Sequence, residues 1–177
     1  MAAKRILSHI SRRGQARMVD VSAKVATRRT AVAEAWVDVG PAIARRLRAT
    51  GGVAKGNVLQ TARLAGIMAA KRTPELIPMC HPLALESVEV EASLVGRRVR
   101  IVAAVSCEGK TGVEMEAIFS AAVAALTVYD MVKSAGKGVE IGPVRLLEKA
   151  GGKSGTWSRE GKAKREEERE KTENGEG

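Results

Sequence analysis

Aromatic side chains are scarce in this chain of 177 residues, which has only two Trp, one Tyr and one Phe. Proteins that bind single-stranded nucleic acid stack the bases on aromatic rings. Here Trp36, Phe119, Tyr129 and Trp157 are scattered and are not interleaved with basic residues. A sheet that binds RNA would also need aromatic residues on its central strands. We therefore expect no nucleic-acid partner.

Cysteine and histidine are also rare, with two residues of each. Two cysteines, Cys80 and Cys107, do not make a disulfide framework for a chain of this size, so we expect a reduced, cytoplasmic protein. Cys80 and His81 are adjacent and lack the spacing of zinc ligands, and only Cys107 and His9 remain besides them, so no metal site is predicted. Neighbours in an extended segment point to opposite sides, which disfavours a Cys80–His81 nucleophilic dyad.

Long apolar runs are missing as well. No run reaches the roughly 18 to 20 residues that span a bilayer, and no signal-type segment follows the N-terminus, so we expect no membrane partner. The chain is 45% hydrophobic and can bury one core, which predicts a single domain over residues 1–157. Its N-terminal arm, to about residue 24, is either a strand or a mobile segment. The tail, 158–177, lacks periodic apolar residues and is predicted to be disordered or a frayed helix.

Positive charge is abundant. The formal net charge is +10, and the part of the chain before Ser158 carries +11, because the tail holds six basic and seven acidic residues. Such an excess implies an anionic partner. Since the aromatic content disfavours nucleic acid, a phosphorylated small molecule is the expected partner.

Apolar alternation and turn residues predict the order β-α-α-β-β-α-β. The expected strands are 31–39, 85–95, 99–107 and 144–150, and the expected helices are 42–49, 57–71 and 113–134. Pro41 opens the first helix, Asn57 caps the second, and Pro74 ends it. This order matches an α+β, ferredoxin-like fold, in which helices pack on one face of an antiparallel sheet.

Two glycine-rich loops, Gly109–Lys110–Thr111 and Gly152–Lys153–Ser154, are similar to the end of a P-loop. The earlier glycine that completes the motif is absent from both, which disfavours a P-loop. Lys110 remains either an anion-binding residue before the long helix or part of a solvent-facing turn.

The long helix carries Glu116, Asp130 and Lys133 near the ends of an apolar run. Charged groups in such positions either serve chemistry or lie at solvated helix ends. His81, between Pro78 and Pro82, is either structural or an acid–base candidate. These alternatives cannot be separated by spacing alone.

Seven blocks between about residues 7 and 157 resemble signature sequences of the molybdenum cofactor biosynthesis protein C family, the cyclic pyranopterin monophosphate synthases. They are MVDVS (18–22), KGN (55–57), TAR (61–63), IPMCHPL (77–83), GKTGVEMEA (109–117), YDMVK (129–133) and GGKSG (151–155).

The resemblance implies a phosphorus–oxygen lyase that converts 3′,8-cyclo-7,8-dihydroguanosine 5′-triphosphate into cyclic pyranopterin monophosphate and diphosphate. It implies catalytic roles for Asp130, Lys133 and Lys55. The substrate-binding residues that it implies are Met79, Cys80, His81, Glu114, Met115, Glu116, Lys149 and an arginine, for which Arg29 fits better than Arg28. It also implies that no cofactor is required, and whether Mg²⁺ joins the phosphates stays open. The alternative is a purine-nucleotide-binding regulator without catalysis.

Helix geometry, together with the substrate contacts that the resemblance implies for both Glu116 and Asp130, predicts that this protein is a homo-oligomer. Glu116 and Asp130 are 14 residues apart, or about 21 Å along a helix axis, so one pocket in a single chain cannot reach both. A two-fold interface would let one subunit present the Asp130 end and its neighbour the Glu116 end. The family resemblance implies a homohexamer, built as a trimer of such dimers.

Overall fold

A five-stranded antiparallel sheet forms the centre of the molecule, which we describe from a computed structural model covering residues 15, 18–153 and 155–160. In sheet order the strands are β4 (Ser87–Val95), β5 (Arg98–Gly109), β1 (Thr27–Asp38), β6 (Glu140–Ala150) and β7 (Trp157–Ser158). The helices are α1 (Gly40–Thr50), α2 (Val58–Lys71), α3 (Thr73–Leu76) and α4 (Glu114–Val132), and a small hairpin joins β2 (Gly52–Val53) to β3 (Gly56–Asn57). The predicted ferredoxin-like fold is confirmed.

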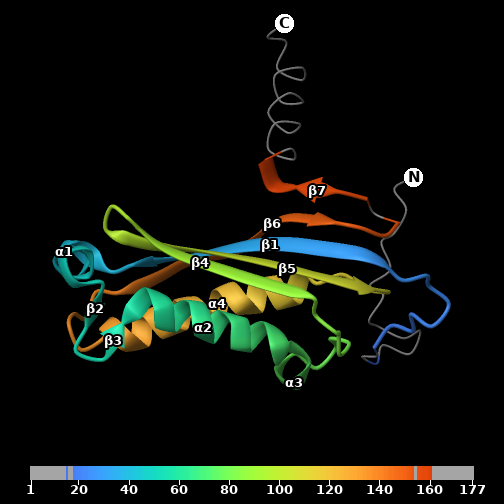
Figure 1. Cartoon of the computed structure of the whole chain (residues 1–177), viewed down its shortest axis with the longest axis horizontal. Coiled ribbons are helices and arrows are strands. Elements are labelled where there is room, and N and C mark those ends of the chain that lie inside the picture. The colour runs from blue at the N-terminus through green and yellow to red at the C-terminus, as the bar shows by residue number, and fades with distance from the viewer. Residues whose placement is uncertain (1–14, 16–17, 154, 161–177) are drawn as a thin grey trace, which may run out of the picture.

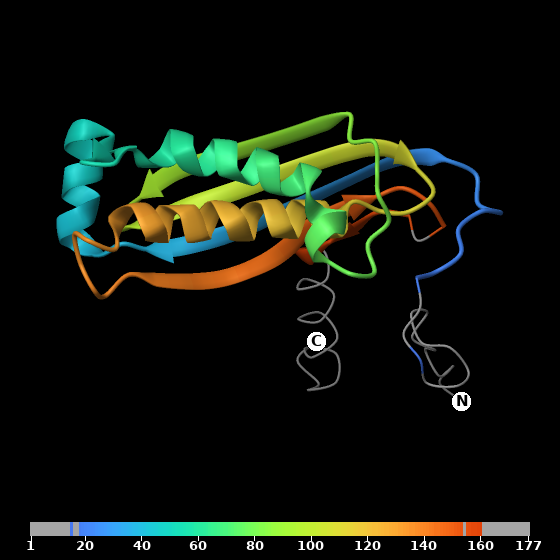
Figure 2. The same ribbon diagram turned by 90° about the horizontal axis from the view of Figure 1, so that it is seen from below.

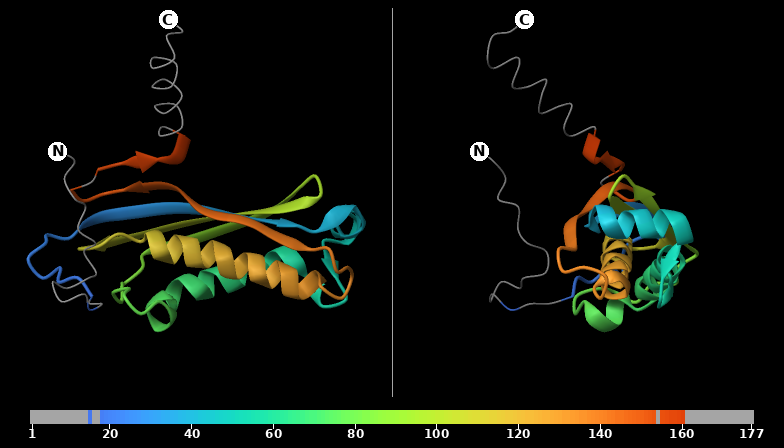
Figure 3. Two further views of the ribbon diagram at one scale, coloured as in Figure 1. Left: turned by 180° about the vertical axis from the view of Figure 1, so that it is seen from behind. Right: turned by 90° about the vertical axis from the view of Figure 1, so that its left-hand side faces the viewer.

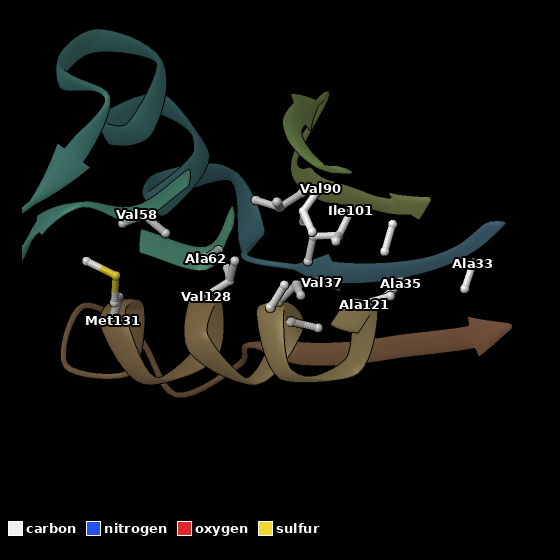
Figure 4. Close-up of a cluster of buried hydrophobic side chains, with 14 of the residues drawn as sticks. Ala33, Ala35, Val37, Val58, Ala62, Val90, Ile101, Ala121, Val128 and Met131 are labelled. Atoms are coloured by element: carbon white, nitrogen blue, oxygen red, sulfur yellow. The ribbon is translucent and has the colours of Figure 1, made fainter. Parts of the chain in front are cut away.

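Helices α2 and α4 lie side by side on one face of the sheet, and α1 lies at one end of it (Figures 1 and 2). The alternation predicted for the first strand explains this packing. Ala31, Ala33, Ala35 and Val37 of β1 are all buried toward the helices. Their small side chains, with those of α4, form the core that Figure 4 shows.

The two long helices approach each other closely at Gly66 of α2. A Cβ atom added at Gly66 would lie 3.1 Å from the carbonyl oxygen of Ser120 in α4 and 3.2 Å from its hydroxyl oxygen. Glycine therefore permits the approach. Among the residues that the structure describes, Ser120 Oγ is the one buried side-chain N or O atom without a hydrogen-bond partner.

The other face of the sheet carries no helix (Figure 3). Glu34 lies there with only 3% of its surface exposed, and Arg100 and Arg145 each form an ion pair with it, at 3.0 and 2.7 Å. Burial alone would raise the pKa of the Glu34 carboxyl, but hydrogen bonds from Arg145 and Arg100 lower the pKa overall. Trp36 lies beside this group, with Arg98 4.9 Å from its ring centre.

Several boundaries differ from the sequence predictions. β1 starts four residues earlier than predicted and β6 starts at Glu140 instead of 144. α2 ends at Lys71 as predicted, but Pro74 lies in a separate short helix, α3, that was not predicted. The predicted disordered tail begins too early, because Ser158 pairs with Glu148 of β6. The rest of the predicted tail, 161–177, and most of the arm before residue 18 lie outside the described residues.

α4 also corrects the prediction that no apolar segment is long enough to span a bilayer. By length and composition alone this helix could cross a membrane, although half of the apolar window is buried inside the molecule. Glu114, Glu116 and Asp130 interrupt the run in the sequence, but they lie near the helix ends and leave an apolar middle. The helix packs along α2 and the sheet as a core element.

Candidate active site

The first group of predicted site residues lies at the C-terminal end of α4. Lys133 Nζ is 2.8 Å from Asp130 Oδ1, and Lys55 Nζ is 3.1 Å from Oδ2. Lys55 Nζ also donates to the Asp130 backbone carbonyl at 3.0 Å. We call these three residues the charged triad. More than 40% of each side chain is exposed, so the triad is open to a ligand.

Local backbone structure brings Lys55 to α4. Gly51, with φ of 68°, ends α1 in a left-handed conformation, and Gly56, with φ of 111°, follows Lys55 as the first residue of β3. Asn57 then caps α2, since its side chain accepts a hydrogen bond from the Gln60 N–H at 3.1 Å. The predicted cap is confirmed, and it fixes where the hairpin lies relative to the helices.

Asp130 and Lys133 hold each other in their charged forms. Hydrogen bonds from Lys133 and Lys55 lower the pKa of the Asp130 carboxyl, and the hydrogen bond to Asp130 raises the pKa of the Lys133 ammonium. At neutral pH, Asp130 is thus a carboxylate beside two proton donors. Such a group can accept a proton at one atom and return one at another.

The second group lies at the N-terminal end of α4. Lys149 of β6 forms an ion pair with Glu114 at 2.8 Å. A Cβ atom at Gly112 would overlap the Glu114 carboxylate, so glycine leaves room for it. Burial would raise the pKa of Glu114, but the hydrogen bond from Lys149 and the nearby charges of Lys149 and Arg29 lower it overall.

Arg29 belongs to this second group and Arg28 does not. The Arg29 guanidinium lines a cavity of about 740 Å³ beside Glu114 and Lys149, and its Nε donates to the Gly109 carbonyl at 3.2 Å. Arg28 is exposed and lines none of the cavities found in the described residues. The preference for Arg29 is therefore consistent with the structure.

A second cavity, of about 330 Å³, adjoins the first and is lined by the other predicted substrate-binding residues: Met79, Cys80, His81, Met115 and Glu116. His81 Nε2 is 2.9 Å from the backbone oxygen of Val19 in the arm. The four residues Lys24, Thr111, Gly112 and Glu114 line both cavities.

Burial raises the pKa of both Glu116 and Cys80. Glu116 is 3% exposed, and burial, with a smaller contribution from Glu114, raises its pKa. It is therefore not at a solvated helix end. Burial and the charge of Glu116 raise the pKa of the Cys80 thiol, which keeps it protonated and unsuited to nucleophilic attack.

The two groups do not meet within one chain. The triad is beside the β2–β3 hairpin, and the larger cavity is lined by residues at the start of β1 and just after β5. Figure 1 shows that the hairpin and the start of β1 are at opposite ends of the molecule. Glu116 and Asp130 both lie in α4, so the rise of a helix puts them about 21 Å apart along its axis.

Sequence reasoning noted Lys153 in a loop similar to the end of a P-loop, but it listed neither Lys153 nor Lys24 as a site residue, and both line the larger cavity with Lys110. The Gly151–Gly152 pair before Lys153 was an available signal, since both glycines have positive φ, of 105° and 70°. Within the described part of the chain, no three His, Cys, Asp or Glu residues are grouped to hold a metal ion.

Comparisons with known proteins identify the family of this chain. The family model of the MoaC family matches residues 18–152. Curated proteins named cyclic pyranopterin monophosphate synthase are similar over most of their length. That of Streptomyces avermitilis is 55% identical over 86% of this chain and 89% of its own, and that of Thermomicrobium roseum is 54% identical over 87% and 93%. The protein of Methylobacterium sp. is 55% identical over 86% and 96%.

Proposed function

The chain belongs to the MoaC family, and on that basis we propose that it is a cyclic pyranopterin monophosphate synthase. It is a lyase that converts 3′,8-cyclo-7,8-dihydroguanosine 5′-triphosphate into cyclic pyranopterin monophosphate and diphosphate, a step of molybdenum cofactor biosynthesis. The observation that carries the mechanism is the charged triad, in which one carboxylate accepts hydrogen bonds from two ammonium groups.

The triad supplies proton transfer. Opening and closing rings on a pterin precursor requires protons to be removed and returned, and a carboxylate flanked by two ammonium groups can do both. Asp130 acts as the acceptor because it is an ionised carboxylate at neutral pH, and Lys55 and Lys133, which carry protons, act as donors; the lowered pKa of Asp130 keeps it ionised and does not strengthen it as a base. The residues of the second cavity, with Glu116 and His81, contact the rings of the substrate.

Cations near the phosphates supply the remaining chemistry. Negative charge builds on the leaving oxygens as the bond to diphosphate breaks, and Arg29 and Lys149 stabilise that charge electrostatically. The reaction needs no redox cofactor. Any Mg²⁺ would arrive on the phosphates of the substrate, since protein groups for a separate site are lacking among the described residues.

The active form is a homo-oligomer built from two-fold dimers, and by family resemblance a trimer of such dimers. One stripe of α4 supports this. Met115, Phe119, Ala122, Leu126 and Tyr129 recur at spacings of four and three, and Met115, Leu126 and Tyr129 are 37%, 57% and 38% exposed. Such spacing is typical of the apolar stripe along which one helix packs against another.

The centre of the stripe fixes the geometry of the dimer. Ala122 is the midpoint of the stripe. The midpoint between Glu116 and Asp130 is residue 123, one position after Ala122. An antiparallel crossing of two copies of α4 at Ala122 would therefore set Glu116 of one copy near Asp130 of the other. Each dimer then holds two complete sites. We place the enzyme in the cytoplasm.

Turnover of the proposed substrate tests this function. Purified protein is incubated with the cyclic dihydroguanosine triphosphate, and diphosphate and the pterin product are measured separately. Stoichiometric formation of both, abolished in Asp130→Ala, is expected. Saturable binding of the triphosphate without release of diphosphate would instead identify a nucleotide-binding regulator.

A further inference from the structure

The larger cavity accounts for only part of the positive charge of this chain. A second group of basic residues lies at the other end of the sheet, where α1 and the turn between β4 and β5 are close together (Figure 1). All six residues of this group are exposed. They are Arg45, Arg46 and Arg48 of α1, Arg97 and Arg98 at the turn, and Lys137 in the loop before β6. We call this group the basic end.

Contacts within the chain hold the three parts of the basic end together. Arg48 of α1 donates a hydrogen bond to the Gly96 carbonyl of the turn at 2.9 Å. The loop that carries Lys137 packs against α1, since a Cβ atom added at Gly136 would lie 3.2 Å from Ile43 Cδ1. The six cations therefore belong to one surface.

Few carboxylates neutralise the basic end. α1, the turn and the loop contain no acidic residue, and the nearest ones in the sequence are Asp38 before α1 and Glu140 after the loop. Asp38 forms an ion pair with Arg97 at 2.9 Å. Within the part of the chain that the structure describes, the other five cations have no carboxylate partner. Even with Glu140 included, an excess of four positive charges remains, which attracts an anionic partner.

Three of the guanidinium groups are held in place. Arg48 is fixed by its hydrogen bond to the turn, and Arg97 by its ion pair with Asp38. Arg98 lies 4.9 Å from the centre of the Trp36 ring. Attraction of a substrate by charge alone requires no fixed geometry, whereas a bidentate bond to a carboxylate does. Arginine and aromatic residues are also enriched at protein interfaces, where lysine is depleted. The basic end is therefore organised for direct contact.

We infer that the basic end is a docking surface for an acidic surface of another protein, whose carboxylates pair with the arginines of α1 and the turn. A nucleic acid fits less well, because α1 has 11 residues and a length of about 16 Å, less than half of one turn of DNA. The positive net charge of this chain disfavours a second copy as the partner.

The docking surface is next to one end of the proposed active site. Arg46 lines a cavity of about 400 Å³ together with residues of the β2–β3 hairpin, and this hairpin carries Lys55 of the charged triad. A partner bound to the basic end would therefore lie beside the triad without occupying it. The inference concerns a surface outside the substrate cavities and does not depend on the proposed function.

Fluorescence anisotropy of a labelled octaglutamate peptide, titrated with the full chain, tests this surface. Arg45 and Arg48 are three residues apart and share one helix face. Arg45→Gln/Arg48→Gln should weaken peptide binding at least about fivefold, because two exposed ion pairs are lost. Lys71→Gln/Arg72→Gln is the matched control: it removes the same charge from exposed positions at the end of α2, and its affinity should stay within about twofold of wild type.

A second variant separates guanidinium contacts from charge alone. Arg45→Lys/Arg48→Lys keeps the charge but should recover only part of the affinity, because an ammonium group cannot form a bidentate bond with a carboxylate. Full affinity in this lysine variant would overturn the inference, as would equal peptide binding by Arg45→Gln/Arg48→Gln and wild type. RNA of eight nucleotides whose binding depends on Arg45 and Arg48 more strongly than peptide binding does would assign the surface to nucleic acid instead.

Turnover and oligomer size separate docking from the other roles of a basic surface. Arg45→Gln/Arg48→Gln should keep kcat and kcat/KM within about twofold of wild type and form the same oligomer by native mass spectrometry. A fall in kcat/KM at unchanged kcat would show that the basic end attracts the substrate, and dissociation of the oligomer would show that it contacts another subunit. Either result overturns the inference. The peptide is titrated without substrate, so a chain that turns over no substrate would contradict the proposed function and leave this test unaffected.

Discussion

Two inactive variants should restore each other's activity if the site is shared between subunits. Asp130→Ala removes the acceptor at one end of α4, and Glu116→Ala removes a substrate contact at the other end. In a dimer of either variant alone, both sites lack one residue. In a mixed dimer, one site lacks both residues and the other site is intact.

The expected recovery follows from counting sites. With equal amounts and random pairing, about half of the dimers are mixed and each has one intact site, so about 25% of wild-type activity should return. The control mixes Asp130→Ala with Lys133→Ala. Both changes lie in the charged triad, so every site of a mixed dimer keeps one defect and activity should stay at the level of the single variants.

The assay measures diphosphate release after the two chains are unfolded together and refolded, with native mass spectrometry to count mixed species. Variants that form mixed oligomers in statistical proportion, yet are no more active than the Asp130→Ala and Lys133→Ala control, would refute the shared site. Recovery in the control mixture would refute it too, because it would show that the triad residues come from different subunits.

Four further outcomes are expected. Asp130→Ala and Lys133→Ala, assayed for diphosphate release, should each lower turnover by at least roughly a hundredfold with an unchanged circular dichroism spectrum, and near-normal activity would exclude the triad from catalysis. Ser120→Ala removes an unpaired buried hydroxyl and should stabilise the fold by about 1 kcal/mol, raising the melting temperature by ~2–4 °C at fixed protein concentration; a lower melting temperature would show that the hydroxyl has a partner. Glu34→Gln leaves two arginines unpaired and should cost about 2 kcal/mol at pH 7. Because the pKa of Glu34 is lowered in the folded state, the ionised carboxylate stabilises the fold at neutral pH. In thermal melts, the difference in melting temperature between Glu34→Gln and wild type should shrink as the pH falls below about 4.5. Truncation after Glu160 should leave melting temperature and turnover unchanged, because the removed segment has no core-forming pattern; a large loss of either would show that it docks.

The sequence predicted those elements whose signals are local. Alternation from Ala31 to Val37 identifies a strand with one buried face, because successive side chains point to opposite sides of a sheet. Asn57 identifies a helix start, because its side chain can accept a hydrogen bond from a backbone N–H that has no partner within the helix. Each signal needs only a few neighbouring residues, so tertiary context does not change it.

The elements that were missed have no such signal. β2, β3 and β7 are two residues long, too short to show a period. In β6, a register shift opposite Ala35–Val37 of β1 falls between Ile141 and Val144 and interrupts the alternation of side chains there. The alternation was therefore visible only over the last part of β6, and the predicted start at residue 144 was four residues late.

One part of the site could be predicted from local signals, and another part could not. Arg29 shares the odd-numbered face of β1 with Ala31, so the register of the strand favours Arg29 over Arg28 for the helix side. The different environments of Glu116 and Asp130 were not predictable. Glu116 is buried because the arm and the loop with His81 cover its end of α4, and these segments come from distant parts of the sequence.

The outward stripe of α4 connects the fold to the proposed assembly. A helix that packs on a sheet needs one apolar face, and Ala117, Ala121, Ala124 and Val128 provide it. The stripe centred on Ala122 adds a second apolar face with no partner among the described residues, which is why the whole helix is apolar enough to pass for a membrane span. In water such a face favours burial against another surface. In our proposal, this face packs against a second copy of α4, and the contact buries the stripe. The same contact brings the Asp130 end of one helix to the Glu116 end of the other and so completes two sites.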